Sequence, residues 1–312
     1  MILVVDTGID DALALALAVR HPRIQLEAVV TSWGNVALDL VNNNTLRVLD
    51  WLGAQDVPVV SGADRPLVGA AIDAGHFHGQ DGLGGARLPS STRAVLKDGV
   101  DYLIERLMAA PGELSLVCTG PFTNPALAVQ QEPRIVECVR EVVVMGGTAQ
   151  LPGNVTPVAE FNVAADPEAA AIVFDQTWPI TMVGLDVTQQ VVLHATDVRR
   201  LENESSTEAV LTREVTRYLF EQRAMESMAL HDPLAVGVAL DHSLVTVSRG
   251  PVHVETRGEC TRGQTVFDLR PWALQPPSNT RVALKVDALR FRRMFFETLG
   301  LGRFLERAQE QR

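Results

Sequence analysis

Residues 4–11 read VVDTGIDD, and this stretch decides the first structural unit of the chain. Residues 2–5 form a continuous apolar run with β-branched members, which is typical of a parallel strand buried on both faces. Gly8 permits a sharp turn after the run. Residues 10–20 are rich in Ala and Leu, which favour a helix. The stretch therefore predicts a strand, a tight turn and a helix.

Three carboxylates, those of Asp6, Asp10 and Asp11, fall within this turn. Neighbouring anions repel one another, so each resists ionisation unless a cation relieves the repulsion. Carboxylate oxygens are hard ligands that suit Ca²⁺ or Mg²⁺ better than Zn²⁺ or copper. The competing interpretation is that Asp10 and Asp11 only cap the helix. Asp6 lies at the strand end, where no cap is needed and where open α/β sheets bind ligands, and this favours a cation site.

Bulk composition narrows the class of protein. The chain has 312 residues, of which 46% are hydrophobic and 21% charged, as in an ordinary globular protein. A net charge of -11 argues against a general nucleic-acid binder, which usually carries a basic face. The three cysteines form no CxxC and predict neither a disulfide framework nor a zinc ribbon. With no secretory signal pattern and no apolar segment of spanning length, we expect a cytoplasmic protein without membrane contact.

Strand-like and helix-like runs alternate along the rest of the chain. Further strand candidates are residues 26–31, 57–60, 114–118, 142–145 and 180–183, and helix candidates are residues 37–52, 99–109, 124–131 and 167–174. This alternation predicts an α/β fold with a doubly wound, mostly parallel (Rossmann-like) sheet flanked by helices. Short apolar runs at residues 244–247, 252–255, 265–269 and 281–286 predict extra strands near the C-terminus. Because no linker or repeat is visible, one domain spanning residues 1–312 is the simplest organisation.

The helices and loops around these strands are predicted as follows. Residues 207–230 read as one long helix, and a next helix follows with Asp232 as N-cap and Pro233 as first helical residue. Residues 287–307 read as a final helix. The Gly-, Pro- and His-rich segments 62–97 and 146–157 interrupt the alternation, and loops of this length in a compact domain are usually either functional or disordered.

Polar residues recur where the predicted strands end. Asn35 follows the second strand, Thr119 the fourth, and Met145 leads into a segment that carries Asn154 and Glu160. Individually, such residues are more often turn formers or helix caps. Their repeated placement at one edge of one sheet predicts a site there.

Together these segments resemble the nucleoside hydrolases, the inosine–uridine preferring N-ribohydrolase family. The last six positions of the family signature DxDPGxDD are matched by DTGIDD at residues 6–11. The other matching segments are WGNV (33–36), HGQDGLG (78–84), TGPFTN (119–124), VVMGG (143–147), AEFN (159–162), DPEAA (166–170) and HDP (231–233). They occur in the family's order and spacing over nearly the whole chain.

The resemblance implies a cofactor and a binding site. The Ca²⁺ ligands that it implies are Asp6, Asp11, the backbone carbonyl of Thr119, and Asp232. The ribose contacts that it implies are Asp10 and Asn162 for the 2′-hydroxyl, Asp232 for the 3′-hydroxyl, Asn154 and Glu160 for the 5′-hydroxyl, and the Met145 backbone. His78 matches a position near the base, and Phe161 lies within the AEFN match.

The implied reaction is hydrolysis of the N-glycosidic bond of a ribonucleoside to free base and ribose, in nucleoside salvage. The sugar passes through an oxocarbenium-like state, and a divalent cation lowers the pKa of a water bound to it. Asp6 corresponds to the base that takes the water proton, and Asn35 would help to position that water. His231 matches the group that assists the departing base. The alternative for His231 is packing against the preceding helix end, without a role in proton transfer.

The chain departs from the family signature at two positions. Val4 stands where the family has its first Asp, and Thr7 stands where it has Pro. The missing Asp is expected to act behind the direct ligands, and such losses typically cost about 10–100-fold in metal affinity or activity. We therefore expect Ca²⁺ to bind more loosely here.

Base preference and rival functions stay open. Tyr218 and Gln222 lie in the helix that contacts the base in the family, but Val215 and Leu219 stand where a pyrimidine-active member has tyrosines. The sequence therefore does not choose between purine and pyrimidine. The alternative function is a non-catalytic, Ca²⁺-dependent nucleoside or ribose binding protein. An aspartate-nucleophile phosphatase is disfavoured, because such enzymes commonly carry an Asp where this chain has Gly8. The expected partner is a small nucleoside, and the resemblance implies a homodimer or homotetramer.

Overall fold

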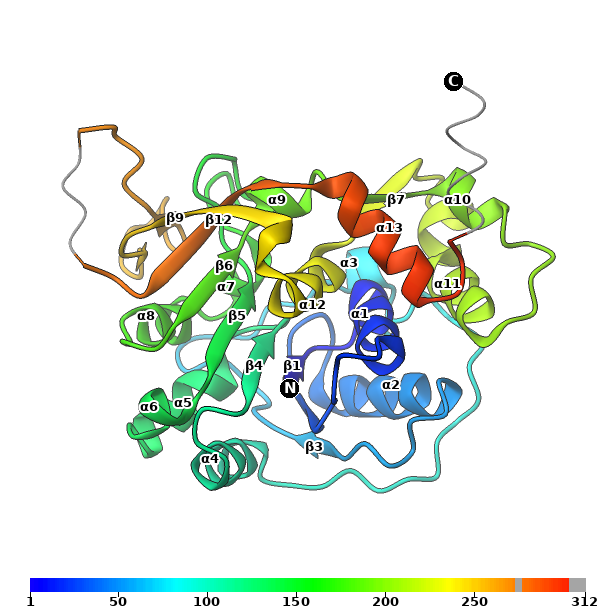
Figure 1. Ribbon diagram of the computed structural model, residues 1–312, viewed down its shortest axis with the longest axis horizontal. Helices are drawn as coiled ribbons and strands as arrows, with labels where there is room; N and C mark the ends of the chain where they lie inside the picture. Colours follow the sequence, from blue (N-terminus) through cyan, green and yellow to red (C-terminus); the bar gives the residue numbers. More distant parts are fainter. Residues whose placement is uncertain (273–276, 303–312) are drawn as a thin grey trace.

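The computed structural model describes residues 1–272 and 277–302. Within them, a central sheet has the strand order β3-β2-β1-β4-β5-β6-β12-β9, with helices on both faces (Figure 1). Its strands are β1 (Ile2–Val5), β2 (Ala28–Thr31), β3 (Val59–Ser61), β4 (Ser115–Cys118), β5 (Glu141–Met145), β6 (Ile180–Val183), β9 (Val245–Arg249) and β12 (Thr280–Val286). Neighbouring strands are parallel except β9, which runs antiparallel to β12. The doubly wound, mostly parallel sheet is confirmed.

The sheet separates two apolar cores. In β1, Leu3 and Val5 face one core, and Ile2 and Val4 face the other, because successive side chains point to opposite faces. The first core is covered by α1 (Ile9–Arg20), α2 (Leu38–Trp51), α11 (Thr207–Arg217), α12 (His231–Leu240) and α13 (Ala288–Thr298). The second is covered by α4 (Gly99–Ala109), α5 (Thr123–Gln131), α6 (Ile135–Cys138) and α8 (Pro167–Phe174). Burial on both faces explains why the strands read as continuous apolar runs.

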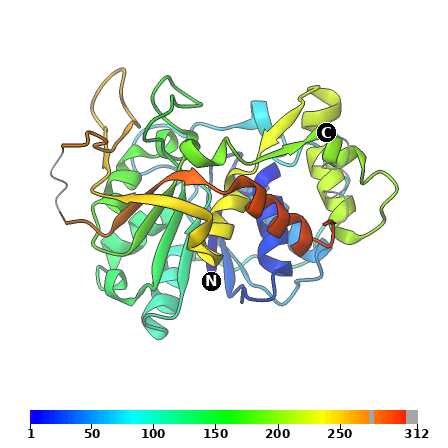
Figure 2. The same ribbon diagram turned by 45° about the horizontal axis from the view of Figure 1, so that its top comes forward.

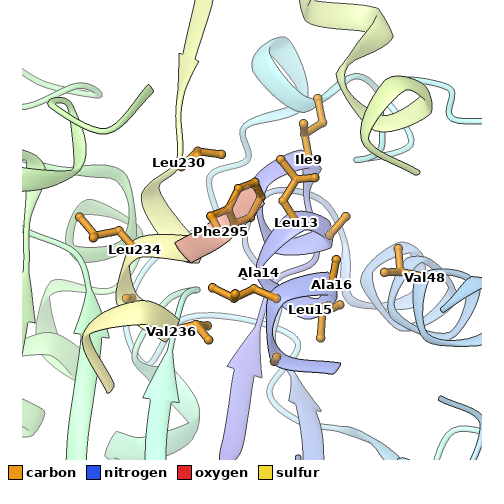
Figure 3. Packing of buried hydrophobic residues seen from close by; sticks show 14 of the residues in the cluster. Ile9, Leu13, Ala14, Leu15, Ala16, Val48, Leu230, Leu234, Val236 and Phe295 are labelled. Carbon is orange, nitrogen blue, oxygen red and sulfur yellow. The ribbon is translucent and has the colours of Figure 1, made fainter. Parts of the chain in front are cut away.

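Helix α1 is buried on nearly every side. Its residues from Ile9 to Ala18 are all buried, as expected for a helix that is apolar all round. Figure 3 shows α1 with Val48 of α2 on one side and, on the other, Leu234 of α12 and Phe295 of α13. This packing fixes the turn before α1 relative to the first turn of α12.

The order of the strands reverses between β1 and β4. From β1 the chain proceeds outward to β2 and β3, and it then returns to β4 on the other side of β1. Open α/β sheets leave a crevice beyond the carboxyl ends of the strands at such a point. Asp6 directly follows β1 and Thr119 directly follows β4, so both lie at this crevice.

Short elements complete the described chain. They are α3 (Gly75–His78), α7 (Phe161–Ala165), α9 (Leu185–Thr188), α10 (Ala195–Arg199), β7 (Val192–His194), a π-helical turn (Tyr218–Gln222), β8 (Ser227–Ala229), a 3-10 turn (His242–Leu244), β10 (His253–Val254) and β11 (Thr265–Val266). Strands β7 and β8 form one antiparallel pair, and β10 and β11 form another. The extra C-terminal strands are therefore confirmed, although β10 and β11 are shorter than predicted. None of the helices in the described ranges is both long and apolar enough to cross a membrane.

The prediction of one helix over residues 207–230 was wrong. Helix α11 ends at Arg217, the backbone N–H of Arg223 donates to the Tyr218 carbonyl in a wider π-type turn, and Ala224 has a φ of +51°. The chain then pairs with β7 as β8. Apolar spacing continues through this region, so periodicity alone could not reveal the break.

The starts and ends of two later helices also differ from the prediction. Leu230, not Asp232, is the N-cap of α12, because the helix begins at His231 and the Asp232 carboxylate lies in an acidic cluster instead. The final helix, α13, ends at Thr298, before Gly300 with a φ of +69°. Residues 303–307 of that predicted helix lie outside the described residues.

Candidate active site

Buried carboxylates gather beyond the carboxyl end of β1. The carboxylate cluster consists of Asp6, Asp10, Asp11 and Asp232, all buried. Asp10, Asp11 and Asp232 each present an oxygen atom within 4.8 Å of the other two. Burial, and then repulsion from neighbouring carboxylates, raise the pKa of Asp10 to about 7 and hold the pKa values of Asp6 and Asp232 well above their usual range. A bound cation would relieve the repulsion among these carboxylates.

Asp6 carries an unsatisfied oxygen. Its Oδ2 atom accepts a hydrogen bond from the backbone N–H of Asn35 at 2.8 Å. Its Oδ1 atom is buried and has no hydrogen-bond partner among the described residues. A Cβ atom on Gly120 would lie 2.8 Å from Oδ1, so glycine keeps the space beside it open. Buried carboxylate oxygens are rarely left without a partner, and a hard cation would provide one.

Asp11 is held from two strand ends. Its Oδ2 atom accepts from the Gly8 N–H at 2.9 Å and from Asn35 Nδ2 at 3.2 Å, while Oδ1 accepts from the Thr119 hydroxyl at 2.8 Å. The bond to Gly8 is a helix cap, so both interpretations of Asp11 are compatible. The resemblance named only the carbonyl of Thr119, and the hydroxyl link to Asp11 was not foreseen. Asn35 Nδ2 also donates to the Asp6 carbonyl at 3.2 Å, which ties β1 and β2 together.

Asn162 connects the ends of β4 and β5. Its Nδ2 atom donates to the Thr119 carbonyl at 2.7 Å and to the Met145 carbonyl at 3.1 Å. Both amide protons are thereby used, so Oδ1 is the atom that could accept a bond from a ligand hydroxyl. The carbonyl of Thr119 has a second lone pair and can still face a cation.

Glu160 acts as a helix cap at the start of α7. Its carboxylate accepts from the backbone N–H groups of Asn162 at 3.0 Å and Gly147 at 2.9 Å. Burial raises its pKa to about 7. The exposed Asn154 accepts from the Phe161 N–H at 3.0 Å, so the loop after β5 is tied to the same turn. A chain of hydrogen bonds therefore links these residues to the carboxylate cluster, and their contact with a sugar stays a prediction.

The two histidines of the predicted site are both near the cluster and neutral. His78, at the end of α3, accepts from the Ile9 N–H at 3.0 Å through Nδ1, so its proton lies on Nε2. Burial lowers the pKa of His78 to about 3, with a further contribution from nearby His231. His231 begins α12, its Nδ1 atom lies 2.7 Å from the Thr188 hydroxyl, and burial lowers its pKa to about 4. The bond to Thr188 shows that His231 is not held by packing alone.

Hydrogen bonds join the segment that carries His78 to helix α11 and the π-helical turn. Arg217 donates to the Gly85 carbonyl at 2.9 Å, Arg223 donates to the His76 carbonyl, and the Arg87 N–H donates to Glu214 at 2.9 Å. Figure 2 shows α3, in cyan, beside the yellow-green region that contains β8. Sequence reasoning missed these contacts, because each has a backbone group as donor or acceptor and such groups carry no sequence signal.

Other matched residues support the loops and not the cluster itself. Trp33 donates through Nε1 to the Thr123 hydroxyl at 3.2 Å, and Thr123 donates to Asp166 at 2.7 Å. Thr7, which replaces the family's Pro, shares a buried 2.7 Å hydrogen bond with the Thr45 hydroxyl, so its added polar group is satisfied. The Val4 side chain packs in the second apolar core. Val4 lies in β1 two residues before Asp6, so a carboxylate at position 4 would lie close behind Asp6.

The chain was compared with known proteins. The family model described as inosine-uridine preferring nucleoside hydrolase matches residues 1–293. The inosine-uridine preferring nucleoside hydrolase of Crithidia fasciculata is 40% identical over 93% of this chain and 94% of the relative. The pyrimidine-specific ribonucleoside hydrolase RihA of Citrobacter koseri is 36% identical over 95% and 96%, respectively. The solved purine-preferring ribonucleoside hydrolase from Gardnerella vaginalis superposes with a TM-score of 0.90 at 33% identity, covering 96% of this chain and 98% of that one. The chain therefore belongs to the inosine-uridine preferring nucleoside hydrolases, a family of N-glycosyl hydrolases.

Proposed function

We propose that this protein hydrolyses the N-glycosidic bond of ribonucleosides in a Ca²⁺-dependent reaction that releases free base and ribose. The observation that carries the proposal is the buried carboxylate cluster at the β1/β4 crevice, with its unpartnered Asp6 oxygen, in a chain of this family. Ionised carboxylates this close and this buried are unfavourable without a compensating cation.

The residues present fit a hard divalent cation. The proposed ligands are Asp6, Asp11, the Thr119 carbonyl and Asp232, which together supply only oxygen atoms, as Ca²⁺ prefers. The orphaned Oδ1 of Asp6 supports this assignment over a purely structural acidic network. Ca²⁺ bound there would acidify a water molecule and bind vicinal ribose hydroxyls.

The protein's own residues would bind the sugar and handle the water proton. Asp10 and Oδ1 of Asn162 would share the one hydrogen bond that the 2′-hydroxyl donates, and Asp6 would take the proton of the attacking water. Asn35, which already donates to Asp6 and Asp11, would hold that water in place. The negative cluster would also stabilise the positive charge that develops on the sugar ring.

His231 would assist the leaving base as a hydrogen-bond donor. Its lowered pKa makes the ring neutral near pH 7, so it would donate through one N–H group and would not carry a full positive charge. The electron pair of the C1′–N bond would pass to the base nitrogen, which Nε2–H of His231 would stabilise. The base would then take its proton from solvent.

The relatives of this chain differ in the bases for which they are named. The relatives are named for inosine and uridine, for pyrimidines and for purines, so their names favour no single base for this chain. We propose inosine and uridine as the first substrates to test. We also propose, from the resemblance alone, a role in nucleoside salvage in the cytoplasm as a homodimer or homotetramer.

The function is tested by ribose release from inosine, adenosine, guanosine, uridine and cytidine, with Asp10→Ala as the matched inactive control. Turnover by the wild type that is lost in Asp10→Ala supports the proposal and ranks the bases. If the folded protein binds nucleosides in the presence of Ca²⁺ but releases no ribose from any of them, the binding-protein alternative replaces it.

A further inference from the structure

Helix α9 places a buried hydroxyl beside the candidate leaving-group residue. Thr188 is the last residue of α9 and is fully buried, and its Oγ1 atom lies 2.7 Å from Nδ1 of His231. The family motifs described above end at residues 166–170 and resume at residue 231, so none of them contains Thr188. None of the roles proposed above for binding or catalysis involves Thr188.

The position of Thr188 is rigidly defined. The Leu185 N–H donates to the Gly147 carbonyl at 2.9 Å, and a Cβ atom on Gly184 would lie 2.7 Å from that same carbonyl. The Asp186 carboxylate accepts from two backbone N–H groups of the loop after β5, each at 2.7 Å. Helix α9 is thus attached to the loop after β5, the same loop whose Gly147 N–H donates to the Glu160 carboxylate.

His231 is attached to the same region from its other side. The N–H of Leu230 donates to the Val191 carbonyl at 2.8 Å, and Val191 lies three residues after Thr188. The β7–β8 pairing continues this contact, with Val192 opposite Ala229. The backbone therefore brings His231 to Thr188, and the hydroxyl then selects the orientation of the ring.

The hydroxyl of Thr188 differs from other helical threonine hydroxyls in this chain. Thr45, Thr212 and Thr216 each donate to the carbonyl four residues earlier, which is the common arrangement. In Thr188 the hydrogen bond goes to an imidazole 43 residues away in the chain. A neutral imidazole has one donor and one acceptor nitrogen, so the partner of Nδ1 decides which nitrogen carries the proton.

We propose that Thr188 is a positioning residue for the leaving-group step: its hydroxyl donates to Nδ1 of His231 and thereby presents Nε2–H to the departing base. This inference rests on the proposed function. A hydroxyl can be the donor to Nδ1, whereas a backbone carbonyl in its place would force the proton onto Nδ1 and leave Nε2 without one. Because the hydroxyl is uncharged, it orients the ring without stabilising a charged imidazolium, as a carboxylate would.

The test compares Thr188→Val, which keeps the shape and removes the hydroxyl, with Thr188→Ser, which keeps the hydroxyl. Each variant is assayed on inosine and uridine and on 4-nitrophenyl β-D-ribofuranoside, whose leaving group departs as a stabilised phenolate and needs no donor. Thr188→Val should lower kcat on the nucleosides by about 10–100-fold. This loss is smaller than the loss in kcat expected when a donor to the transition state is removed altogether, because His231 itself is still present. The kcat of Thr188→Val on the nitrophenyl riboside should stay nearly unchanged, and Thr188→Ser should retain activity on all three substrates.

A double-mutant cycle with His231→Ala identifies the path of the effect. If Thr188 acts through His231, adding Thr188→Val to His231→Ala should cause no further loss on inosine. An equal loss on nucleosides and on the nitrophenyl riboside, an additive double mutant, or no loss in Thr188→Val would each overturn the inference while leaving the proposed function intact. A wild-type protein that releases ribose from none of these substrates would remove the proposed function itself and this inference with it.

Discussion

Replacing Gly8 by alanine would place a methyl group against two side chains of the candidate site, His78 and Asn35. The added Cβ atom would lie 2.5 Å from Nδ1 of His78 and 2.6 Å from Nδ2 of Asn35. Ordinary contact begins at 3.4 Å, so His78 would have to move by 0.9 Å. That shift would break the bond from the Ile9 N–H and turn Asn35 away from Asp6 and Asp11.

Both the activity and the stability of Gly8→Ala should fall. Misplacing a reacting group by about 1 Å can cost about 100-fold in rate, so kcat/KM for inosine should fall by about that factor. Overpacking of this kind should lower the free energy of unfolding by about 1–3 kcal/mol. Steady-state kinetics and thermal unfolding on the same preparations separate the two effects.

Gly53→Ala is the matched control. Its added Cβ atom meets nothing within 4 Å, but its φ of +72° makes alanine strained by about 1–2 kcal/mol. It should therefore lose comparable stability while keeping its kcat/KM. If Gly8→Ala retained nearly full activity, or if Gly53→Ala lost as much activity as Gly8→Ala, the reasoning that Gly8 keeps the site open would be refuted.

Three further predictions follow from the same geometry. Without metal, the wild type should lose stability relative to Asp10→Asn as pH rises from about 4 to about 7. The Asp10 pKa of about 7 keeps a proton bound in the folded state, whereas the unfolded chain releases that proton near pH 3.8. Thermal unfolding of both proteins with a chelator checks this, and a stability difference that is independent of pH would contradict it. Arg223→Ala should speed proteolytic cleavage within residues 75–87, because Arg223 donates to the His76 carbonyl. Arg134→Ala, whose partner Glu132 is a neighbour in the chain, should not. Equal cleavage rates in the two variants would show that the Arg223–His76 bond does not hold this segment in place. Val4→Asp should tighten Ca²⁺ binding by up to about 10–100-fold in a calorimetric titration, and unchanged or weaker binding would show that position 4 does not support the ligands.

Local chemistry explains what the sequence could predict. Asp6, Asp10 and Asp11 lie within one turn, so their proximity follows from the chain itself. Buried parallel strands produce apolar runs that are visible without any alignment, which is why the first six strands were found. The loops after these strands were expected at one edge, and the hydrogen bonds among Asn35, Thr119 and Asn162 are consistent with that expectation.

Long-range contacts explain what the sequence could not predict. Asp232 joins the cluster from the far end of the chain, and only the family resemblance pointed to it. Thr188 was missed because a single threonine carries no signal until the β7–β8 pair brings His231 beside it. The break after Arg217 was missed because the π-helical turn preserves apolar spacing while the strand pairing ends the helix.

The most direct measurement is ribose release from inosine and uridine by metal-stripped protein as Ca²⁺ is added back, with Asp6→Asn measured in parallel. We predict that the stripped wild type is inactive, that Ca²⁺ restores turnover in a saturable manner, and that Asp6→Asn is not restored over the same range. Full activity in the stripped protein, or no ribose release at any Ca²⁺ concentration, would contradict the proposal that the carboxylate cluster holds a catalytic calcium ion.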